Sequence, residues 1–103
     1  MKPVIIVSTF PDKTSITKIA NQLVKKKLAA CVNIMKISSV YSWKGKIENQ
    51  PEYLALFKTT KKNQPVLKKE LRKLHPYDIP EIAEINVDSI NQAYLKWLVD
   101  STR

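Results

Sequence analysis

The chain has 103 residues, with 18 lysines and arginines against 9 aspartates and glutamates, and a formal net charge of +9. This length predicts one domain, residues 1–103, which can bury a core without disulfides or structural metal. The single cysteine excludes an intramolecular disulfide and is typical of a reducing cytoplasm. The first apolar run covers only residues 4–7, too few for a membrane span or a signal peptide.

The positive charge draws attention to nucleic acids, because clustered lysines attract phosphate groups. The basic residues are spread along the chain, however, and only Arg72 and Arg103 are arginines, the side chain best suited to bidentate phosphate contacts. Most of the lysines fall on the polar faces of predicted helices. This distribution favours a solvated surface, so a nucleic-acid partner is not expected.

The first half of the chain predicts a strand, a helix and a long hairpin. Residues 4–7 are continuously apolar and β-branched, which is typical of a strand covered on both faces. Apolar residues recur at helical spacing from about residue 12 to 27. Residues 29–41 predict a long strand, and Gly45, the only glycine, predicts the hairpin turn that follows it.

The returning strand starts near residue 46. It contains Pro51, which predicts a bulge or a sheet edge at that point. It then enters residues 53–57, a second continuously apolar run. Pro65 fits the first turn of a second helix, which Pro76 ends.

The last part of the chain predicts one more strand and one more helix. Residues 82–88 alternate between apolar and polar side chains, as in a half-exposed strand. A short helix follows from about residue 91, and its Tyr94 and Trp97 are expected in the core because they lie three positions apart on one face.

This order of elements predicts a ferredoxin-like α+β fold. A βαββαβ arrangement with right-handed crossovers gives a four-stranded antiparallel sheet, here with a long hairpin between the second and third strands and an extra C-terminal helix. The first and third strands are central in this topology, and they are the two that read as continuously apolar. Pattern and topology therefore agree.

The predicted hairpin is longer than a free monomer needs. Its strands span roughly a dozen residues each, against about 5–6 in a typical globular strand. Its far end carries Tyr41 and Trp43 beyond the compact part of the sheet. A long edge strand with exposed aromatic side chains invites pairing with another chain, so we expect self-association.

Cys31 and His75 are the candidate metal ligands. Thiolate and imidazole suit copper, and the carboxylates of Asp78 and Glu81 lie close to His75 in the sequence. One cysteine and one histidine do not complete a four-ligand site of nitrogen and sulfur in one subunit. The structural alternatives are a small buried cysteine and a histidine in a stiff joint between a helix and a strand.

Several common site types have no counterpart in the chain. It contains no Cys-x-x-Cys pair, and no aromatic strand motif of RNA-recognition domains. A Gly-rich phosphate loop is excluded because there is only one glycine. No serine sits in the context of a nucleophile elbow, which argues against a serine hydrolase.

Five motifs follow one another along the chain. They are AACVNI at 29–34, SVYSWKGKI at 39–47, Glu52 followed by KT at 58–59, HPYDIPEI at 75–82, and YLKWL at 94–98. Together they resemble the CutA family of divalent-cation tolerance proteins over nearly the whole length. The resemblance implies a ferredoxin-like subunit in a tight homotrimer, similar to the PII signalling proteins. It also implies tolerance of divalent metals, above all copper, and no enzymatic reaction.

The resemblance implies positions for the family's motifs in this chain. The cysteine motif falls on Cys31 and the His-Pro-Tyr motif on His75, so the pair is expected to bind copper or another divalent cation, across a subunit boundary where one subunit does not suffice. Asp78 stands where the family often has a glutamate, which keeps the carboxylate and shortens its reach.

A second predicted site consists of charged and aromatic residues at strand ends. They are Trp43, Glu52, Lys58, Tyr77 and Glu81, and we expect them to line clefts where the hairpin meets a neighbouring subunit. The expected function is that of a trimeric, metal-responsive or ligand-binding signalling protein. The alternative is an oligomeric scaffold or interaction protein with an indirect link to metal tolerance, in which His75 is structural. Neither reading involves a membrane.

Overall fold

The computed structural model describes residues 1–103, which form four strands and three helices. In chain order the elements are β1 (Pro3–Phe10), α1 (Lys13–Lys25), β2 (Cys31–Trp43), β3 (Lys46–Thr60), α2 (Gln64–Leu74), β4 (Ala83–Asn86) and α3 (Gln92–Ser101). The strands form one antiparallel sheet in the order β2-β3-β1-β4. The predicted ferredoxin-like α+β fold is confirmed, with β1 and β3 in the centre. None of the helices has the length and apolar character needed to cross a membrane.

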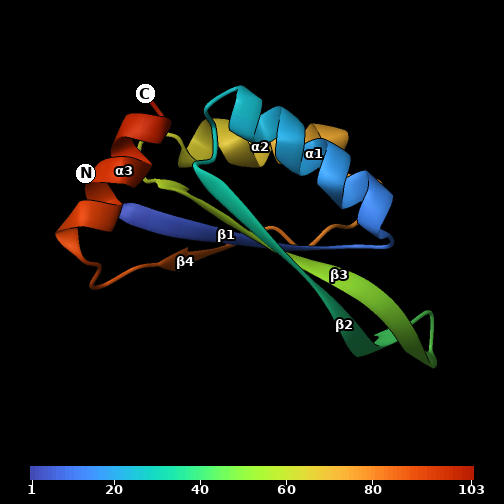
Figure 1. The fold of residues 1–103 in the computed structure, drawn as a ribbon. Helices are drawn as coiled ribbons and strands as arrows, with labels where there is room; N and C mark the ends of the chain where they lie inside the picture. Colours follow the sequence, from blue (N-terminus) through green and yellow to red (C-terminus); the bar gives the residue numbers. More distant parts are fainter.

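Alternate residues of β1 build the core beneath the helices. These buried positions are Val4, Ile6, Ser8 and Phe10. Helices α1 and α2 lie together over this side of the sheet (Figure 1) and cover it with their apolar stripes. The helix residues in the core cluster are Ile16, Ile19, Leu23, Leu67 and Leu71. Because fully burying one such side chain contributes about 1.5–3 kcal/mol, this layer holds the subunit together.

A proline marks each end of helix α2. Pro65 lies in its first turn, where a missing N–H costs no helical hydrogen bond. The helix stops at Leu74, and His75 takes an extended conformation with φ −67° and ψ 135°. A residue before proline favours that conformation, and Pro76 follows. The chain therefore leaves the helix layer and continues to the edge of β1, where β4 pairs.

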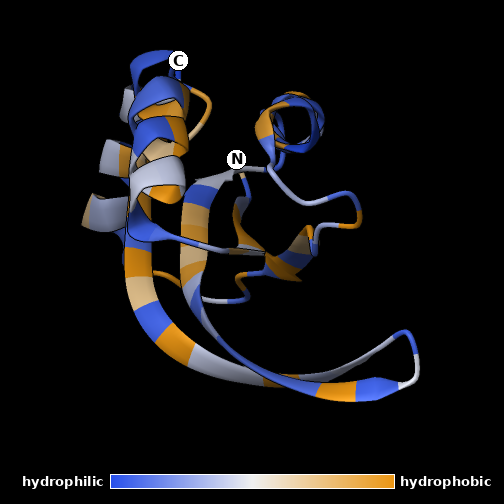
Figure 2. Cartoon of the chain, turned by 90° about the vertical axis from the view of Figure 1, so that its right-hand side faces the viewer, coloured by the Kyte–Doolittle hydropathy of each residue, from blue (hydrophilic) through white to orange (hydrophobic).

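The hairpin of β2 and β3 is long, as predicted, with strands of 13 and 15 residues. Its register is unbroken down to Trp43 opposite Lys46. Lys44 and Gly45 form the two-residue turn with φ of 49° and 79°, the positive values that mirror-image hairpin turns require. Figures 1 and 2 show the paired strands curving out beyond the rest of the sheet, and the longest dimension of the subunit is 45 Å.

The outer half of the hairpin has no third strand beside it, because β1 ends at Phe10 opposite Tyr53. Pro51 lies just past this point, opposite Ser38, and the pairing continues through it. Of the two outcomes that the proline predicts, the structure therefore has the edge and not the bulge. An edge tolerates proline because one side of the strand needs no backbone donor there.

Strand β4 is shorter than predicted, since only four residues of the alternating segment 82–88 are in the sheet. Glu84 points to the side of the helices, where Lys61 and Lys68 bind its carboxylate. The hydrogen bond from Lys61 is the main cause that lowers the pKa of Glu84. Ile85 points the other way and is 51% exposed. The apolar side of β4 is thus uncovered in the single subunit.

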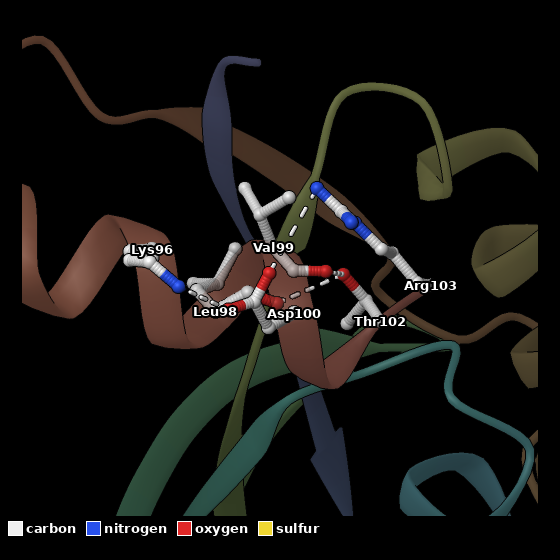
Figure 3. Close-up of polar contacts among 6 residues, drawn as sticks. All are labelled: Lys96, Leu98, Val99, Asp100, Thr102 and Arg103. Carbon is white, nitrogen blue, oxygen red and sulfur yellow. Dashed lines mark hydrogen bonds and ion pairs between the residues drawn. The ribbon is translucent and has the colours of Figure 1, made fainter.

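Helix α3 packs through a narrow side. Leu98 is buried, Tyr94 is half-buried, and Trp97 is 46% exposed. The prediction that Trp97 belongs to the core is therefore wrong, because α3 contacts the sheet mainly through β3 and leaves its outer side free. The hydroxyl of Thr102 donates to the carbonyl oxygen of Leu98 at 2.9 Å and closes the helix (Figure 3).

Candidate functional site

The sheet has a second face, turned away from α1 and α2, which we call the open face. Side chains alternate along a strand, so the residues between the buried positions of β1 point to this face, among them Val7 and Thr9. Their partners on β3 are Leu56 and Leu54, which are also only half-buried. The open face is therefore apolar and has no helix layer like that of α1 and α2 over it.

A groove of about 720 Å³ lies on the open face, between the hairpin and the chain segment that joins α2 to β4. Residues from β1, β2, β3 and the joining segment line it. They are Val7, Thr9, Ile37, Ser39, Tyr41, Trp43, Glu52, Leu54, Tyr77, Asp78, Ile79 and Glu81. The lining comprises three aromatic side chains, three carboxylates and an aliphatic floor from the sheet, and it contains no lysine, arginine or histidine.

One hydrogen bond fastens the joining segment to the sheet across the end of β1. The hydroxyl of Tyr77 donates to Oε2 of Glu52 at 2.7 Å. Burial, with the Glu52 carboxylate as the second cause, raises the pKa of Tyr77 well above its ordinary value. Tyr77 is therefore a neutral donor at physiological pH, and it fixes the orientation of Glu52 on the groove wall.

The structure brings together four of the five residues proposed to bind a ligand. Trp43, Glu52, Tyr77 and Glu81 all line the groove. Lys58 does not, because it lies farther along β3, opposite Ile5 of β1, and its Nζ sits 5.7 Å from the centre of the Tyr94 ring. Lys58 thus belongs to the contact between the sheet and α3 in this subunit.

Sequence reasoning missed several groove residues. Ile37 and Tyr41 lie an even number of positions from Trp43, so the period of two along a strand places all three on one face. Asp78 and Ile79 belong to the segment that the sequence had already marked by its histidine and prolines. The period of two along a strand could have identified Ile37 and Tyr41 as groove residues, and adjacency to Tyr77 could have identified Asp78 and Ile79.

His75 is buried on the helix side of the sheet. Its ring stacks on Phe10, with 4.3 Å between centroids and 18° between planes, and only 9% of the residue is exposed. The backbone N–H of Tyr77 donates to Nδ1 at 3.1 Å, so the neutral ring carries its hydrogen on Nε2, which lies 3.0 Å from Oγ of Ser8. Burial is the main cause that lowers the pKa of His75.

Cys31 lies elsewhere. It is the first residue of β2, pairs with Lys58, and has a free, half-buried thiol. Since Lys58 and Cys31 belong to the open face and Ser8 belongs to the helix side, the sheet stands between Cys31 and His75. One subunit does not bring the two predicted metal ligands together. No group of three or more His, Cys, Asp or Glu side chains is placed to hold a metal ion.

Known proteins with the same sequence pattern and fold are numerous. A family model described as CutA1 divalent ion tolerance protein matches residues 4–101. The chain is 42% identical over 100 residues to the divalent-cation tolerance protein CutA of Pyrococcus horikoshii, covering 97% of this chain and 98% of that protein. It is 41% identical over 98 residues to the protein of the same name from Thermotoga maritima, covering 95% and 97%.

Solved structures agree with this match. The crystal structure of CutA1 from Pyrococcus horikoshii superposes with a TM-score of 0.94 at 41% identity and covers 97% of this chain and 98% of that one. The structure of a protein described as the periplasmic divalent cation tolerance protein CutA from Archaeoglobus fulgidus superposes with a TM-score of 0.94 at 33% identity, covering 98% and 99%.

Proposed function

Because this chain belongs to the CutA family of divalent-cation tolerance proteins, we propose that it is a trimeric, non-enzymatic member that binds a small ligand in the groove of the open face. The groove itself is the observation on which the proposal rests. It joins an apolar floor to a few polar groups that converge from three strands and one connecting segment, which is the usual composition of a small-molecule site.

The chemistry of the groove favours binding over catalysis. Tyr77 is neutral, and its hydroxyl donates a hydrogen bond to Glu52. It therefore orients a carboxylate and does not act as a base. In this proposal the site selects a ligand and signals its presence through the assembly, in the manner of the PII signalling proteins that the family resemblance implies.

The proposal of a trimer rests on apolar area that the subunit leaves uncovered. Val40 and Ile47 on the hairpin are 67% and 69% exposed, and Ile85 on β4 is half exposed. The outer half of the hairpin also has free backbone groups along its edges. Cyclic association of three subunits pairs such edges and leaves none open to propagate a fibre.

A ligand retained from the cell provides the test of the groove. We expect native mass spectrometry of the purified assembly to show a bound small molecule, and Trp43→Leu to weaken its binding about fivefold, since an aromatic wall contributes about 1 kcal/mol. Lys58→Ala is the matched control, because Lys58 lies outside the groove. Equal retention by wild type and both variants would show that the ligand sits elsewhere.

Direct metal binding is the second part of the proposal. We propose that Cys31 binds copper or another divalent cation together with His75 of a neighbouring subunit, since the sheet separates the two residues within one chain. His75 joins such a site only by exchanging its contact with Tyr77 N–H or with Ser8 for the metal. A free thiol suits a reducing compartment, so we place the protein in the cytoplasm.

Thiol labelling of the native protein tests the premise. We expect Cys31 to react with a maleimide before unfolding, because its thiol is half-buried rather than enclosed, and we expect Cu²⁺ to slow that reaction. Labelling in denaturant gives the reference rate, and Cys31→Ser gives the background. A thiol that reacts only after unfolding belongs to the core and is no metal ligand.

One observation favours the alternative, a scaffold or interaction protein with an indirect link to metals. Both ring nitrogens of His75 already have partners inside the subunit, so a purely structural role explains this histidine fully. Copper titration of wild type against His75→Ala separates the two functions. Equal and weak binding by both proteins would support the alternative.

A further inference from the structure

The three carboxylates that line the groove have no cationic partner in the subunit. All the ion pairs of the subunit involve Glu70, Glu84 or Asp100. Glu52 and Glu81, together with Asp78, take part in none of them. In a chain with a net charge of +9, three unpaired carboxylates on one groove form a local negative region.

Glu52 is the most constrained of the three. It is half-buried on β3, and the hydroxyl of Tyr77 binds Oε2, which leaves Oε1 available to an incoming group. A partly buried carboxylate that has already accepted one hydrogen bond attracts a positive charge more strongly than an exposed one, because less water screens it.

The aromatic residues of the groove complement this charge. Tyr41, Trp43 and Tyr77 contribute rings to its walls. The face of an aromatic ring attracts cations, and the Trp43 ring already does so here, with Nζ of Lys44 at 5.8 Å from its centroid. Aliphatic side chains, among them Leu54 and Ile37, supply a floor for an apolar body.

From this combination we propose that the groove takes an organic cation, that is, an ammonium or guanidinium group carried on an aliphatic or aromatic body. The inference rests on the proposed function, in which this groove binds a small ligand, and it adds the chemical class. The cationic head lies against the carboxylates of the groove, and the body lies on the apolar floor against its aromatic walls. A negatively charged ligand finds no basic side chain in the groove.

The other sizeable hollow of the subunit lacks these properties. It has about 620 Å³ and lies beside the N-terminus and the segment between β4 and α3. Lys2 and Lys61 line it together with a single carboxylate, that of Asp88, and no aromatic side chain is present. Of these two hollows, only the groove of the open face combines aromatic rings with several unpaired carboxylates.

Three probes of the same shape and different charge test the inference. The full-length assembly is titrated with phenethylammonium, with 2-phenylethanol and with 3-phenylpropionate, and tryptophan fluorescence and calorimetry follow the binding. We expect the ammonium to bind about tenfold more tightly than the alcohol, as a desolvated contact of a cation with rings and carboxylates allows, and the carboxylate to bind most weakly.

Variants locate the effect. Glu81→Gln should weaken the ammonium about fivefold and leave the alcohol unchanged, as the loss of one partly screened charge implies. Asp88→Asn makes a comparable change of charge outside the groove and should alter neither. Trp43→Leu should weaken both probes. Glu81 and Trp43 are exposed, so these variants fold.

The outcomes distinguish the groove's role as a ligand site from its preference for cations. If the alcohol or the carboxylate binds as tightly as the ammonium and still depends on Trp43, the groove is a ligand site but not one for cations. If no probe binds, the groove itself fails as the ligand site. A parallel titration with Cu²⁺ alone completes the test: binding that depends on Glu81 but not on Trp43, and that displaces the ammonium, would assign the carboxylates to a metal ion instead.

Discussion

Light scattering should give the wild-type protein a mass of three times 11.8 kDa, and the double variant V40D/I47D should reduce it to the mass of one subunit. Val40 and Ile47 lie on the side of the hairpin opposite the groove, and both are largely exposed in the single subunit. Each large apolar side chain that association buries contributes about 1.5–3 kcal/mol. A charge in its place loses that contribution and must also be desolvated.

The control for this experiment is Lys46→Glu, which changes charge on the same hairpin and removes little apolar area. We expect it to remain trimeric at low micromolar concentration. Because association and folding are linked, the midpoint of thermal unfolding should rise with protein concentration for wild type and not for V40D/I47D. A wild-type protein that is a folded monomer at micromolar concentration would contradict the trimer and every site placed between subunits.

His75→Ala should lower the free energy of unfolding by about 2–4 kcal/mol, the second large effect that the structure predicts. The variant loses the stack on Phe10, the hydrogen bond to Tyr77 N–H, and the only side-chain partner of the fully buried Ser8 hydroxyl. Chemical denaturation at pH 7.5 measures the loss. Ser8→Ala is the matched control: it leaves the ring in place and should cost much less, about 1 kcal/mol.

The same histidine predicts how stability depends on pH. Burial lowers the pKa of His75 in the folded protein, whereas the unfolded chain has the ordinary value of about 6.5. As pH falls below that value the unfolded state binds a proton that the folded state still excludes, so the free energy of unfolding decreases until the folded pKa is reached. The chain has one histidine, so His75→Gln should remove this decrease between pH 7.5 and 5.5. An unchanged slope in the variant would assign it to other groups.

The central part of the fold could be predicted from sequence because local patterns decide it. The continuously apolar runs of β1 and β3 predict the two central strands of this topology, each of which has a strand on both sides. Pro65, Pro76 and Gly45 each fix a boundary through backbone geometry alone. These features depend on residues close in the chain, which is why sequence reasoning reaches them.

The errors arise where burial depends on distant parts of the molecule. Trp97 follows the helical period of a core residue, but the subunit offers nothing to cover its side of α3. Glu52 and Lys58 both bracket the apolar run of β3, and their six-residue separation spans roughly 20 Å of strand. Only the register with β1 shows that one lies at the groove and the other at α3. The position of such residues depends on which strand residues they pair with, and the sequence pattern of β3 alone does not give that register.

Tyr77 makes a hydrogen bond at each end: its backbone N–H donates to Nδ1 of His75, and its hydroxyl donates to Glu52. Tyr77 therefore links the buried His75 to the wall of the groove, and loss of either hydrogen bond would free that wall to move. The exchange of the Tyr77 amide hydrogen with solvent therefore reports the opening of this wall, one local event among the many that a native protein samples. A molecule bound in the groove should keep Tyr77 in place and slow the exchange of its amide hydrogen. This one backbone hydrogen would then report whether the groove is occupied, even when the bound molecule has no spectroscopic signal.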